Sequence, residues 1–471
     1  MRAFATTAAI VAATLCLAAG AAADVSSDAL IHADATRALG YTGKGVTVAV
    51  LDTGIDDRNP NLVRSVVAEH CFVPPDGCPN GTAEQDGPGS AQDDQGHGTA
   101  IADVIAGSGA DGPVGVAPDA SLVVVKVADS NGRTSAAQIV AGLTWVAQHH
   151  PEAKVVNVSL GSDILLSGDC SALTPTFKAY AAAVDALRAQ DATVFASSGN
   201  GGSRASMTAP ACVHDAVAVG AVYTRAFGSY TAPFVCRDKI TAADQVACWS
   251  DGGTELDLLA AGAPIDAAGL GSRDSLLAGT SFAAAQAAAA AAVLLQADPA
   301  LTPDALLSLL QSTGVPITDP RNRLTTPRID LAQALGAVLG APVPLLPLPP
   351  GPAPTGRPTL STPTVPRASL SLRPISFGSV GLARTATRRL SVRNSGTGTL
   401  TVRLATSLPS VSVRPAKLTI RSSHAATVLL TFRPTRAGVY RGRLHLETDD
   451  PAAPHIAVAV RGTGHAWSPT R

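Results

Sequence analysis

Three polar side chains stand where strands are expected to end or helices to begin. Asp52 closes an apolar, β-branched segment over residues 46–51, which is typical of a strand buried on both faces. His97 lies between two glycines at the start of a helical pattern, and Ser281 starts an alanine-rich one. An acid, an imidazole and a hydroxyl are the groups that acyl transfer to a nucleophile requires, because the imidazole takes the hydroxyl proton and the acid orients the imidazole.

An amide side chain lies between His97 and Ser281 in the chain. Asn200 follows another apolar segment, and its NH₂ group could donate to an oxyanion, although asparagine beside glycine is also common in plain turns. Asp52 and Ser281 have structural interpretations as well, since Asp and Ser are frequent N-caps of helices. The order Asp, His, Ser is nevertheless one of the known chain orders of a catalytic triad.

Short apolar segments alternate with helical patterns as far as residue 340. We predict strands at residues 46–51, 122–127, 154–158, 192–195 and 216–222, and helices at residues 99–106, 134–149, 177–188 and 281–296. Such alternation indicates an α/β fold with a doubly wound, mostly parallel sheet. In open sheets of this kind the reactive crevice lies beyond the carboxyl ends of the strands, which is where Asp52 is expected.

The segment from about residue 29 to residue 340 resembles the subtilisin-like (subtilase) serine peptidases. The matching motifs, in the order of the family, are Val50-Leu51-Asp52-Thr53-Gly54-Ile55-Asp56, Gly96-His97-Gly98-Thr99, Gly115-Val116-Ala117-Pro118, Val156-Asn157-Val158-Ser159-Leu160-Gly161, Ser198-Gly199-Asn200-Gly201, Glu255-Leu256-Asp257 and Gly279-Thr280-Ser281-Phe282-Ala283. The resemblance implies a subtilisin-like domain over residues 24–340 that hydrolyses peptide bonds through an acyl-enzyme intermediate.

The resemblance also implies a role for each matching residue. Ser281 would be the nucleophile, His97 the general base, and Asp52 the group that orients and stabilises the imidazolium. Asn200 would donate a hydrogen bond to the oxyanion. The substrate-binding strand of the family, to which an extended peptide adds by main-chain hydrogen bonds, matches Ser159, Leu160 and Gly161.

Several positions depart from the pattern of the family. Ala100 and Asp103 replace a histidine and a glycine that usually follow the histidine of the triad, and Ala285-Gln286 replaces the usual Pro-His. These departures favour an alternative, a non-catalytic surface adhesion or scaffold protein that retains the subtilase shell.

Asn61 stands where an aspartate is often a calcium ligand. We therefore expect no metal site and no required cofactor, with calcium left open but without clear ligands.

The beginning of the chain has the pattern of an export signal. Met1-Arg2 precedes an apolar segment at residues 8–19, and Ala21-Ala22-Ala23 offers a cleavage site, so we predict a signal peptide over residues 1–23. The protein is then expected to be secreted, periplasmic or at the cell surface.

Without the signal, an even number of cysteines is left, which favours disulfides in an exported chain. Many pairings are open, and proximity along the chain suggests Cys71–Cys78, Cys236–Cys248 and Cys170–Cys212.

The composition changes beyond residue 340. Residues 341–368 contain ten prolines, which predicts an extended linker. Strand patterns of period two follow at residues 390–393, 400–404, 428–433 and 440–446 and indicate a β-sandwich. Residues 369–465 resemble the Ig-like domains of the choice-of-anchor and ASPM–SPD-2–hydin type, in motifs such as Phe377-Gly378-Ser379-Val380 and Thr448-Asp449-Asp450-Pro451.

A net charge of −1 conceals two parts of opposite charge. From residue 367 onward there are 16 basic and 3 acidic residues, whereas residues 1–366 hold 19 basic and 33 acidic ones. Such a basic domain favours an anionic cell-surface polymer as partner, although alternating arginines are most often a solvated strand face. As partners we expect protein or peptide substrates and this polymer, with no specific nucleic acid, and we expect a monomer.

Overall fold

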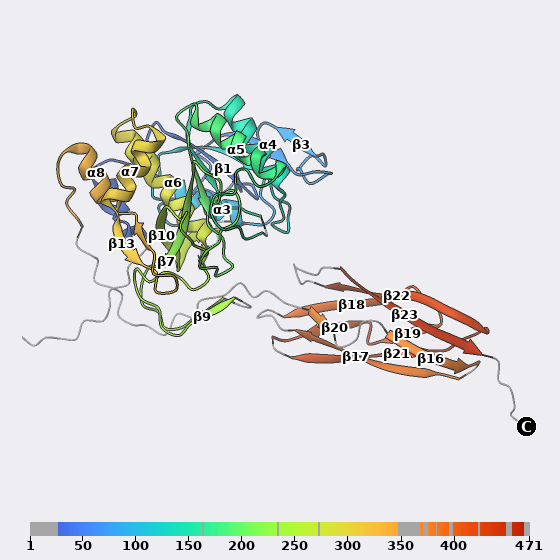
Figure 1. Cartoon of the computed structure of the whole chain (residues 1–471). Coiled ribbons are helices and arrows are strands. Elements are labelled where there is room, and N and C mark those ends of the chain that lie inside the picture. Colours follow the sequence, from blue (N-terminus) through green and yellow to red (C-terminus); the bar gives the residue numbers. More distant parts are fainter. Residues whose placement is uncertain are drawn as a thin grey trace, which may run out of the picture.

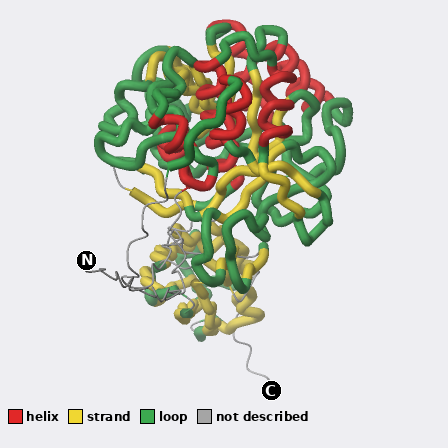
Figure 2. Tube along the Cα trace, turned by 90° about the vertical axis from the view of Figure 1, so that its left-hand side faces the viewer, coloured by secondary structure: helices red, strands yellow, loops and turns green. Residues whose placement is uncertain are grey.

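The computed structural model describes residues 27–162, 164–232, 235–271, 274–346, 368–370, 375–382, 384–394, 399–422, 424–448 and 455–465. The predicted signal peptide and residues 347–367 of the predicted linker lie outside these ranges. Within them the chain forms an α/β part up to residue 346 and an all-β part from residue 368 (Figure 1). Figure 2 shows the helices confined to the α/β part.

A ten-stranded sheet forms the middle of the α/β part. Its strands are β1 Thr47–Asp52, β2 Val66–Phe72, β3 Glu84–Asp86, β4 Ser121–Lys126, β5 Ala153–Val158, β6 Thr193–Ser197, β7 Ala216–Tyr223, β10 Leu258–Ala263, β13 Val315–Thr318 and β14 Thr325–Arg328. They lie in the order β13-β14-β10-β7-β6-β5-β1-β4-β2-β3. Neighbours are parallel from β14 to β2, and only the two outermost pairs are antiparallel.

Helices cover both faces of this sheet. They are α1 Ser27–Leu30, α2 Ala33–Ala38, α3 His97–Ala106, α4 Ala136–His149, α5 Pro175–Arg188, α6 Thr280–Ala297, α7 Pro303–Thr313 and α8 Leu331–Leu339. Val48 and Val50 of β1 belong to a buried cluster with α3, α6 and α8, whereas Ala49 and Leu51 belong to another with α4 and α5. Successive side chains of a strand point to opposite faces. The predicted doubly wound, mostly parallel sheet is thus confirmed.

Helix α6 is a core helix of one layer. By length and composition it could cross a membrane, but 89% of it is buried inside the protein. Its run of alanines allows close contact with β5, β6, β7 and β10. Gln286 is fully buried on this helix, and neither end of its side-chain amide has a hydrogen-bond partner among the described residues.

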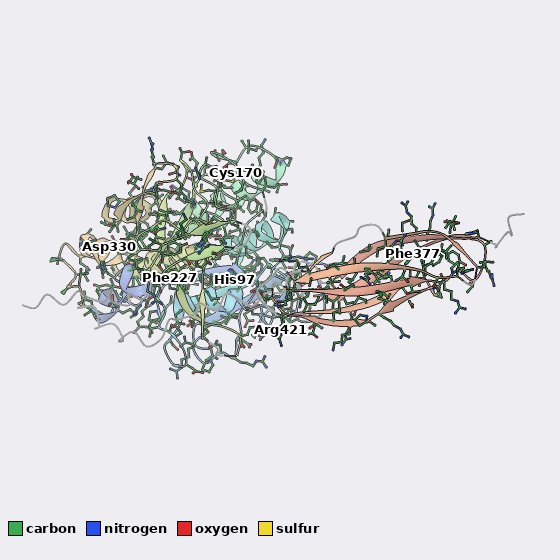
Figure 3. The ribbon with its side chains drawn as sticks, turned by 90° about the horizontal axis from the view of Figure 1, so that it is seen from below. His97, Cys170, Phe227, Asp330, Phe377 and Arg421 are labelled. Atoms are coloured by element: carbon green, nitrogen blue, oxygen red, sulfur yellow. A yellow bond between two sulfur atoms is a disulfide. The ribbon has the colours of Figure 1, made fainter. Side chains whose placement is uncertain are left out.

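Two hairpins and three disulfides complete the α/β part. The hairpins pair β8 Tyr230–Ala232 with β9 Cys236–Asp238, and β11 Ile265–Ala268 with β12 Asp274–Leu277. The disulfides join Cys71 to Cys78, Cys170 to Cys212 and Cys236 to Cys248, which are the pairs that proximity suggests. Figure 3 labels Cys170 in the α/β part. Each cross-link limits the conformations of the unfolded chain and so stabilises the fold.

The all-β part is a sandwich of two sheets, as predicted. One sheet contains β15 Ala368–Leu370, β17 Ala386–Asn394, β19 Val411–Arg414 and β21 Ala425–Phe432; the other contains β16 Ile375–Gly381, β18 Leu400–Thr406, β20 Lys417–Ile420, β22 Gly438–Thr448 and β23 His455–His465. Their inner faces share one apolar core. In β22 the pattern is plain, since Arg443 and His445 are exposed whereas Leu444 and Leu446 are buried.

Candidate active site

A hollow of about 350 Å³ lies at the carboxyl ends of β5 and β6, next to the start of α3 and α6. His97, Asn200, Ser281 and residues 159–161 line it. Asp52 ends the adjacent strand β1 and is fully buried beside His97. The structure therefore brings together all the residues that the sequence singles out for chemistry, from segments up to about 230 residues apart.

Asp52 and His97 form a short hydrogen bond. Asp52 Oδ1 accepts from His97 Nδ1 at 2.7 Å and from the main-chain N–H of Thr53 at 2.8 Å. A carboxylate can only accept, so Nδ1 carries the proton and Nε2 of the neutral ring is left as an acceptor. This is the tautomer that a general base needs. Asp52 Oδ2 has no hydrogen-bond partner among the described residues.

Glycine is needed on both sides of His97, at each position for a different physical reason. Gly96 precedes α3 with a φ of 103°, in the left-handed region that favours glycine. At Gly98 the space is filled, because a Cβ atom would lie 2.2 Å from the carbonyl oxygen of Gly54. The start of α3 consequently sits directly against the turn that follows β1, and this contact holds His97 beside Asp52.

The buried carboxylate of Asp93 caps the same helix. Its Oδ1 accepts from the main-chain N–H of Gly96, and its Oδ2 accepts from the main-chain N–H and the hydroxyl of Thr99. Burial raises the pKa of Asp93, but these hydrogen bonds outweigh it and hold the pKa below the ordinary value. Asp93 therefore stays charged.

Two carboxylates set the basicity of the imidazole. Burial lowers the pKa of His97, but the charge and hydrogen bond of Asp52, together with the charge of Asp93, outweigh burial. The pKa of His97 is thus raised above its ordinary value of 6.5. Its side chain is 26% exposed, which leaves the ring accessible from the hollow.

Ser281 is the second residue of α6 and is joined to the segment after β5. Its hydroxyl donates to the carbonyl of Ser159 at 2.9 Å, and the hydroxyl of Ser159 donates to the carbonyl of Ser281 at 2.8 Å. The ring centroids of Phe282 and His97 are 5.8 Å apart, so the start of α6 adjoins the imidazole. In this structure the Ser281 hydroxyl points to Ser159, and a change of rotamer is needed to turn it toward His97.

The amide of Asn200 is oriented by α6. Its Oδ1 accepts from the main-chain N–H and the hydroxyl of Thr280, each at 3.0 Å. Holding Oδ1 leaves the NH₂ group toward the hollow, where no described residue accepts from it. A Cβ atom on Gly279 would lie 3.8 Å from Asn200 Nδ2, which places this donor close to the residue pair before Ser281.

Asp251 holds the segment that carries Asn200, and the sequence analysis did not identify it. Its Oδ2 accepts from the main-chain N–H of Gly201 at 3.0 Å and its Oδ1 from that of Ser203 at 2.6 Å. Its own N–H donates to the carbonyl of Gly199 at 2.9 Å, and its carbonyl accepts from the Ser198 hydroxyl at 2.8 Å. Asp251 is a positioning residue that fixes the main chain on both sides of Asn200.

The buried environment of Asp251 has an electrostatic cost. Burial raises the pKa of this carboxyl, and the N–H groups of Gly201 and Ser203 with the charge of Arg321 only partly offset the rise. In sequence, Asp251 stands in Ser250-Asp251-Gly252-Gly253, a pattern typical of a plain turn. No local signal distinguishes it from such a turn.

The predicted substrate-binding segment has free main-chain groups. No described residue forms a hydrogen bond with the main-chain N–H or C=O groups of Leu160 and Gly161. Gly161 is closely packed, because a Cβ atom would lie 2.6 Å from Thr208 Oγ1. An extended peptide can therefore pair with this segment as an additional strand.

Asn61, at the position where relatives often supply a calcium ligand, is committed to protein groups. Its Oδ1 accepts from the hydroxyl of Ser108 and the N–H of Ala110, and its Nδ2 donates to Asp103 and to the carbonyl of Pro113. The other oxygen of Asp103 accepts from the N–H of Ala268 at 2.7 Å. These residues do not fit a calcium ion here, because direct hydrogen bonds already close the segment over residues 108–114.

A chelator is therefore expected to leave both activity and Tm unchanged within about 1.5-fold and 1 °C. Asn61→Ala, in contrast, removes the hydrogen bond that Asp103 Oδ1 accepts from Asn61 and the partners of the Ala110 N–H and the Pro113 carbonyl, at a cost of about 1–3 kcal/mol. Its Tm should fall by several degrees. Calorimetry and the rate of peptide hydrolysis, each with and without EDTA, check the effect of the chelator, and calorimetry of Asn61→Ala checks its Tm. A fall in the Tm or the activity of the unmodified protein with EDTA would contradict the first expectation.

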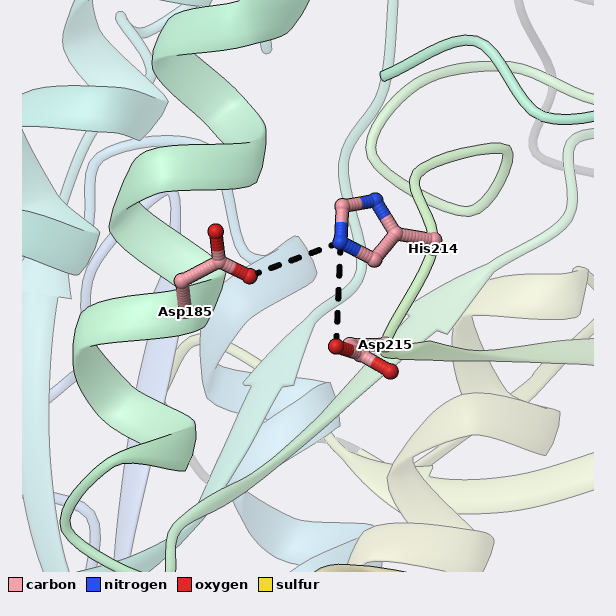
Figure 4. A group of neighbouring side chains, drawn as sticks. All are labelled: Asp185, His214 and Asp215. Atoms are coloured by element: carbon pink, nitrogen blue, oxygen red, sulfur yellow. Dashed lines mark ion pairs between the residues drawn. The ribbon is translucent and has the colours of Figure 1, made fainter.

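A second group of titratable side chains lies at the surface, outside the hollow (Figure 4). His214 Nε2 is 3.6 Å from Asp185 Oδ1 and 3.7 Å from Asp215 Oδ2. Arg188 Nε lies 3.6 Å from Asp215 Oδ2, so a cation of the protein already faces this carboxylate. The three residues in the figure are exposed, and ion pairs of this kind contribute little. They form a surface ion-pair network.

Comparison with known proteins shows what the chain is similar to. The model of the subtilase family matches residues 43–336, and that of the HYDIN/CFA65/VesB-like, Ig-like domain matches residues 366–463. Subtilisin E from Bacillus subtilis (strain 168) is 33% identical over 288 residues, 60% of this chain and 64% of that protein. The extracellular serine proteinase of Thermus sp. (strain Rt41A) is 32% identical over 277 residues, 58% of this chain and 56% of that protein.

A solved structure supports the same comparison at the level of the fold. The structure described as proteases from Pseudoalteromonas arctica PAMC 21717 is 25% identical with a TM-score of 0.52, over 66% of this chain and 94% of that one. The chain spans less than two thirds of the length of the two curated relatives above.

Proposed function

Because the chain belongs to the subtilase family, we propose that it is a secreted serine endopeptidase that cleaves peptide bonds through an acyl-enzyme intermediate. One observation carries the proposal: the hydrogen bond from His97 to the buried Asp52 leaves Nε2 as an acceptor in the hollow that Ser281 lines. The Asn200 amide in the same hollow adds a donor for an oxyanion.

In the proposed reaction, a peptide pairs with residues 159–161, and the Ser281 hydroxyl turns from Ser159 to His97. His97 Nε2 takes the hydroxyl proton while Ser281 Oγ attacks the scissile carbonyl carbon. Asp52 stabilises the imidazolium that forms. The imidazolium then gives its proton to the nitrogen of the leaving amine, and the C–N bond breaks to leave an ester on Ser281.

Water completes the proposed reaction. His97 takes a proton from the water as it attacks the ester carbonyl, and then returns that proton to Ser281 Oγ as the acid product leaves. The NH₂ group of Asn200 donates to the oxyanion formed in each half-reaction. The start of α6 contributes as well, because its first main-chain N–H groups have no partner within the helix and its dipole favours negative charge there.

The rival interpretation is a scaffold that retains the subtilase shell. Four departures from the family pattern suggest it, namely Ala100, Asp103, Ala285 and Gln286. All four are buried in α3 or α6, and none of them lines the hollow. Asp103 in particular has a packing role, since it joins Asn61 to the β11–β12 hairpin. These departures therefore do not favour a loss of catalysis.

A fluorophosphonate probe tests the proposed function directly, because it labels a serine only where a base activates the hydroxyl. The full chain should be labelled, Ser281→Ala should not, and Ser162→Ala should be labelled as well as the unchanged protein. Ser162 is a matched control, since it lines the same hollow and donates only to the carbonyl of Ile164. Absence of labelling in the folded, unchanged chain would favour the scaffold.

The pH dependence follows from His97. The base must be neutral to accept a proton, and its pKa is raised above 6.5, so kcat/KM should rise with pH with a midpoint above that value. Initial rates on a chromogenic peptide between about pH 5 and 9 measure the midpoint. A midpoint below 6.5, or a flat profile, would argue against His97 as the base.

Export and attachment are further parts of the proposal. The predicted signal peptide, the three disulfides and the extracellular relative from Thermus support secretion of the enzyme. The excess of 16 basic over 3 acidic residues from residue 367 onward supports attachment of the sandwich to an anionic cell-surface polymer.

A further inference from the structure

Two arginines of the sandwich face each other across a pair of antiparallel strands. The register of β22 and β23 pairs Arg441 directly with Arg461, and both side chains are exposed. Like charges in directly opposite positions destabilise a sheet. Among the described residues, neither guanidinium has an ion-pair or hydrogen-bond partner. The pair therefore has a positive charge that the protein itself does not compensate.

A hollow of about 490 Å³ lies over this pair, on the outer face of β16, β23 and β22. Ser376 on β16 is in register with Arg461 and brings a hydroxyl to the hollow, and Thr463 brings a second one. Val439 at its side is 66% exposed and provides an apolar wall. Guanidinium and hydroxyl groups can all donate to oxygen atoms of a ligand.

The charge around the hollow has one sign. Arg443 is the next outward residue after Arg441 on β22, and it faces the small Ala459. Glu447 is the only acidic residue that the structure describes in the sandwich, and its register places it opposite Arg403. It is six positions from Arg441, or roughly 20 Å along the strand, so it cannot neutralise the pair.

We infer that Arg441 and Arg461 form a binding site for the carboxylate or phosphate groups of an anionic cell-surface polymer. The planar fork of a guanidinium matches either oxyanion with two parallel hydrogen bonds. An anion between the two arginines also removes the repulsion between them. This inference rests on the proposed attachment of the sandwich and is independent of the peptidase activity.

The strand geometry favours a polymer over a single small anion. Outward residues of one strand, such as Arg441 and Arg443, recur about every 7 Å, so a chain with repeated charges can engage several cations together. Single-stranded nucleic acid is disfavoured, because it binds largely by stacking its bases on aromatic side chains. No aromatic residue lines this hollow in the part of the sandwich that the structure describes.

The test compares two double variants of the full chain, both carrying Ser281→Ala to prevent self-digestion. Arg441→Gln with Arg461→Gln removes the pair. Arg389→Gln with Arg393→Gln removes the same charge from exposed positions of β17 on the other sheet, where the residues opposite are Leu429 and Ala425. Binding to immobilised polygalacturonate and to immobilised polyphosphate is measured between low and physiological salt, and thermal melts confirm that both variants fold.

We expect binding that weakens as salt rises, at least a tenfold loss of affinity in Arg441→Gln/Arg461→Gln, and less than a threefold loss in the control. Binding to polygalacturonate alone or to polyphosphate alone supports the site and identifies carboxylate or phosphate as its ligand. Equal losses in the two variants would overturn the site, because attachment would then depend on the total charge of the sandwich and not on this arginine pair. If the parent chain binds neither polymer, the attachment and the site both fail, while labelling at Ser281 still tests the peptidase separately.

Discussion

Asp52→Asn is expected to lower kcat by about 10³- to 10⁴-fold at pH 7, with little change in KM. The carboxylate is fully buried and holds His97 through a 2.7 Å hydrogen bond, so its charge stabilises the imidazolium of the transition state in a site with little water. Asparagine retains the size of the side chain and removes that charge. Peptide binding along residues 159–161 does not involve Asp52, which is why KM should change little.

In Asp52→Asn a shift in the dependence of kcat/KM on pH should accompany the loss of kcat, and this shift distinguishes the loss from a structural defect. Burial lowers the pKa of His97, and Asp52 opposes burial more than Asp93 does. Without the Asp52 charge, the pKa of His97 falls, and the midpoint of the kcat/KM profile moves to lower pH. The profile and kcat are measured on the same chromogenic peptide.

Asp57→Asn provides the matched control, because it removes the same charge from a residue five positions away that lies outside the hollow. Its kcat should stay within about twofold of the unchanged protein. If Asp52→Asn retains more than a tenth of the original kcat, or if its profile moves to higher pH, Asp52 does not stabilise the imidazolium.

The elements that position the site were predictable because their signals are local. The strand expected at residues 46–51 is Thr47–Asp52 in the structure, since its apolar residues are buried on both faces, Val48 and Val50 on one and Ala49 and Leu51 on the other. The helix expected at residues 134–149 is Ala136–His149, and its start is set by the Ser135 side chain, which accepts from the N–H of Gln138. Periodicity and a cap suffice for elements of this kind.

Short edge elements gave weaker signals. The sheet edges β3 and β13 have only three and four residues, too few for a period to be visible. In the sandwich, β16 is interrupted by Gly378, and β19 and β20 have four residues each. Their strand conformation depends on pairing with neighbours that are distant in sequence, and the sequence pattern does not contain that information.

The same reasoning explains the missed parts of the site. The reciprocal hydrogen bonds between Ser159 and Ser281 join residues 122 positions apart, and Asp251 follows Gly201 by 50 positions. Motifs placed Asp52, His97 and Ser281 because each stands at the end of an element. Asp251 acts through the main chain of another loop, and only the packed structure shows that contact.

Asn200→Ala is expected to lower kcat by about 10²- to 10³-fold without raising KM, a range taken from the equivalent donor in the related subtilisin. The amide can act only if its NH₂ group faces the oxyanion, and two contacts ensure this. Thr280 holds Asn200 Oδ1, and Asp251 holds the main chain after Asn200. Steady-state kinetics at saturating substrate measure the loss.

Asp251→Asn should reproduce part of this loss, because it weakens the hydrogen bonds that hold the segment carrying Asn200. An asparagine at this position can accept only one of the two N–H groups that the carboxylate now accepts, and its own NH₂ group faces the other. The segment that carries Asn200 is then held less firmly, and kcat should fall by about tenfold with KM unchanged. A loss of general stability alone would instead lower the amount of active enzyme, which titration with the fluorophosphonate probe detects.

A double-mutant cycle separates positioning from a direct role. If Asp251 acts only by orienting Asn200, then Asp251→Asn should cost less than about twofold in kcat when Asn200 is already alanine, because no oxyanion donor is left to misplace. If the two losses multiply instead, Asp251 affects the reaction by another route, for instance through the shape of the hollow beside Gly199. Non-additivity of this kind would establish that a buried aspartate, 51 positions after Asn200, is needed to orient the oxyanion donor.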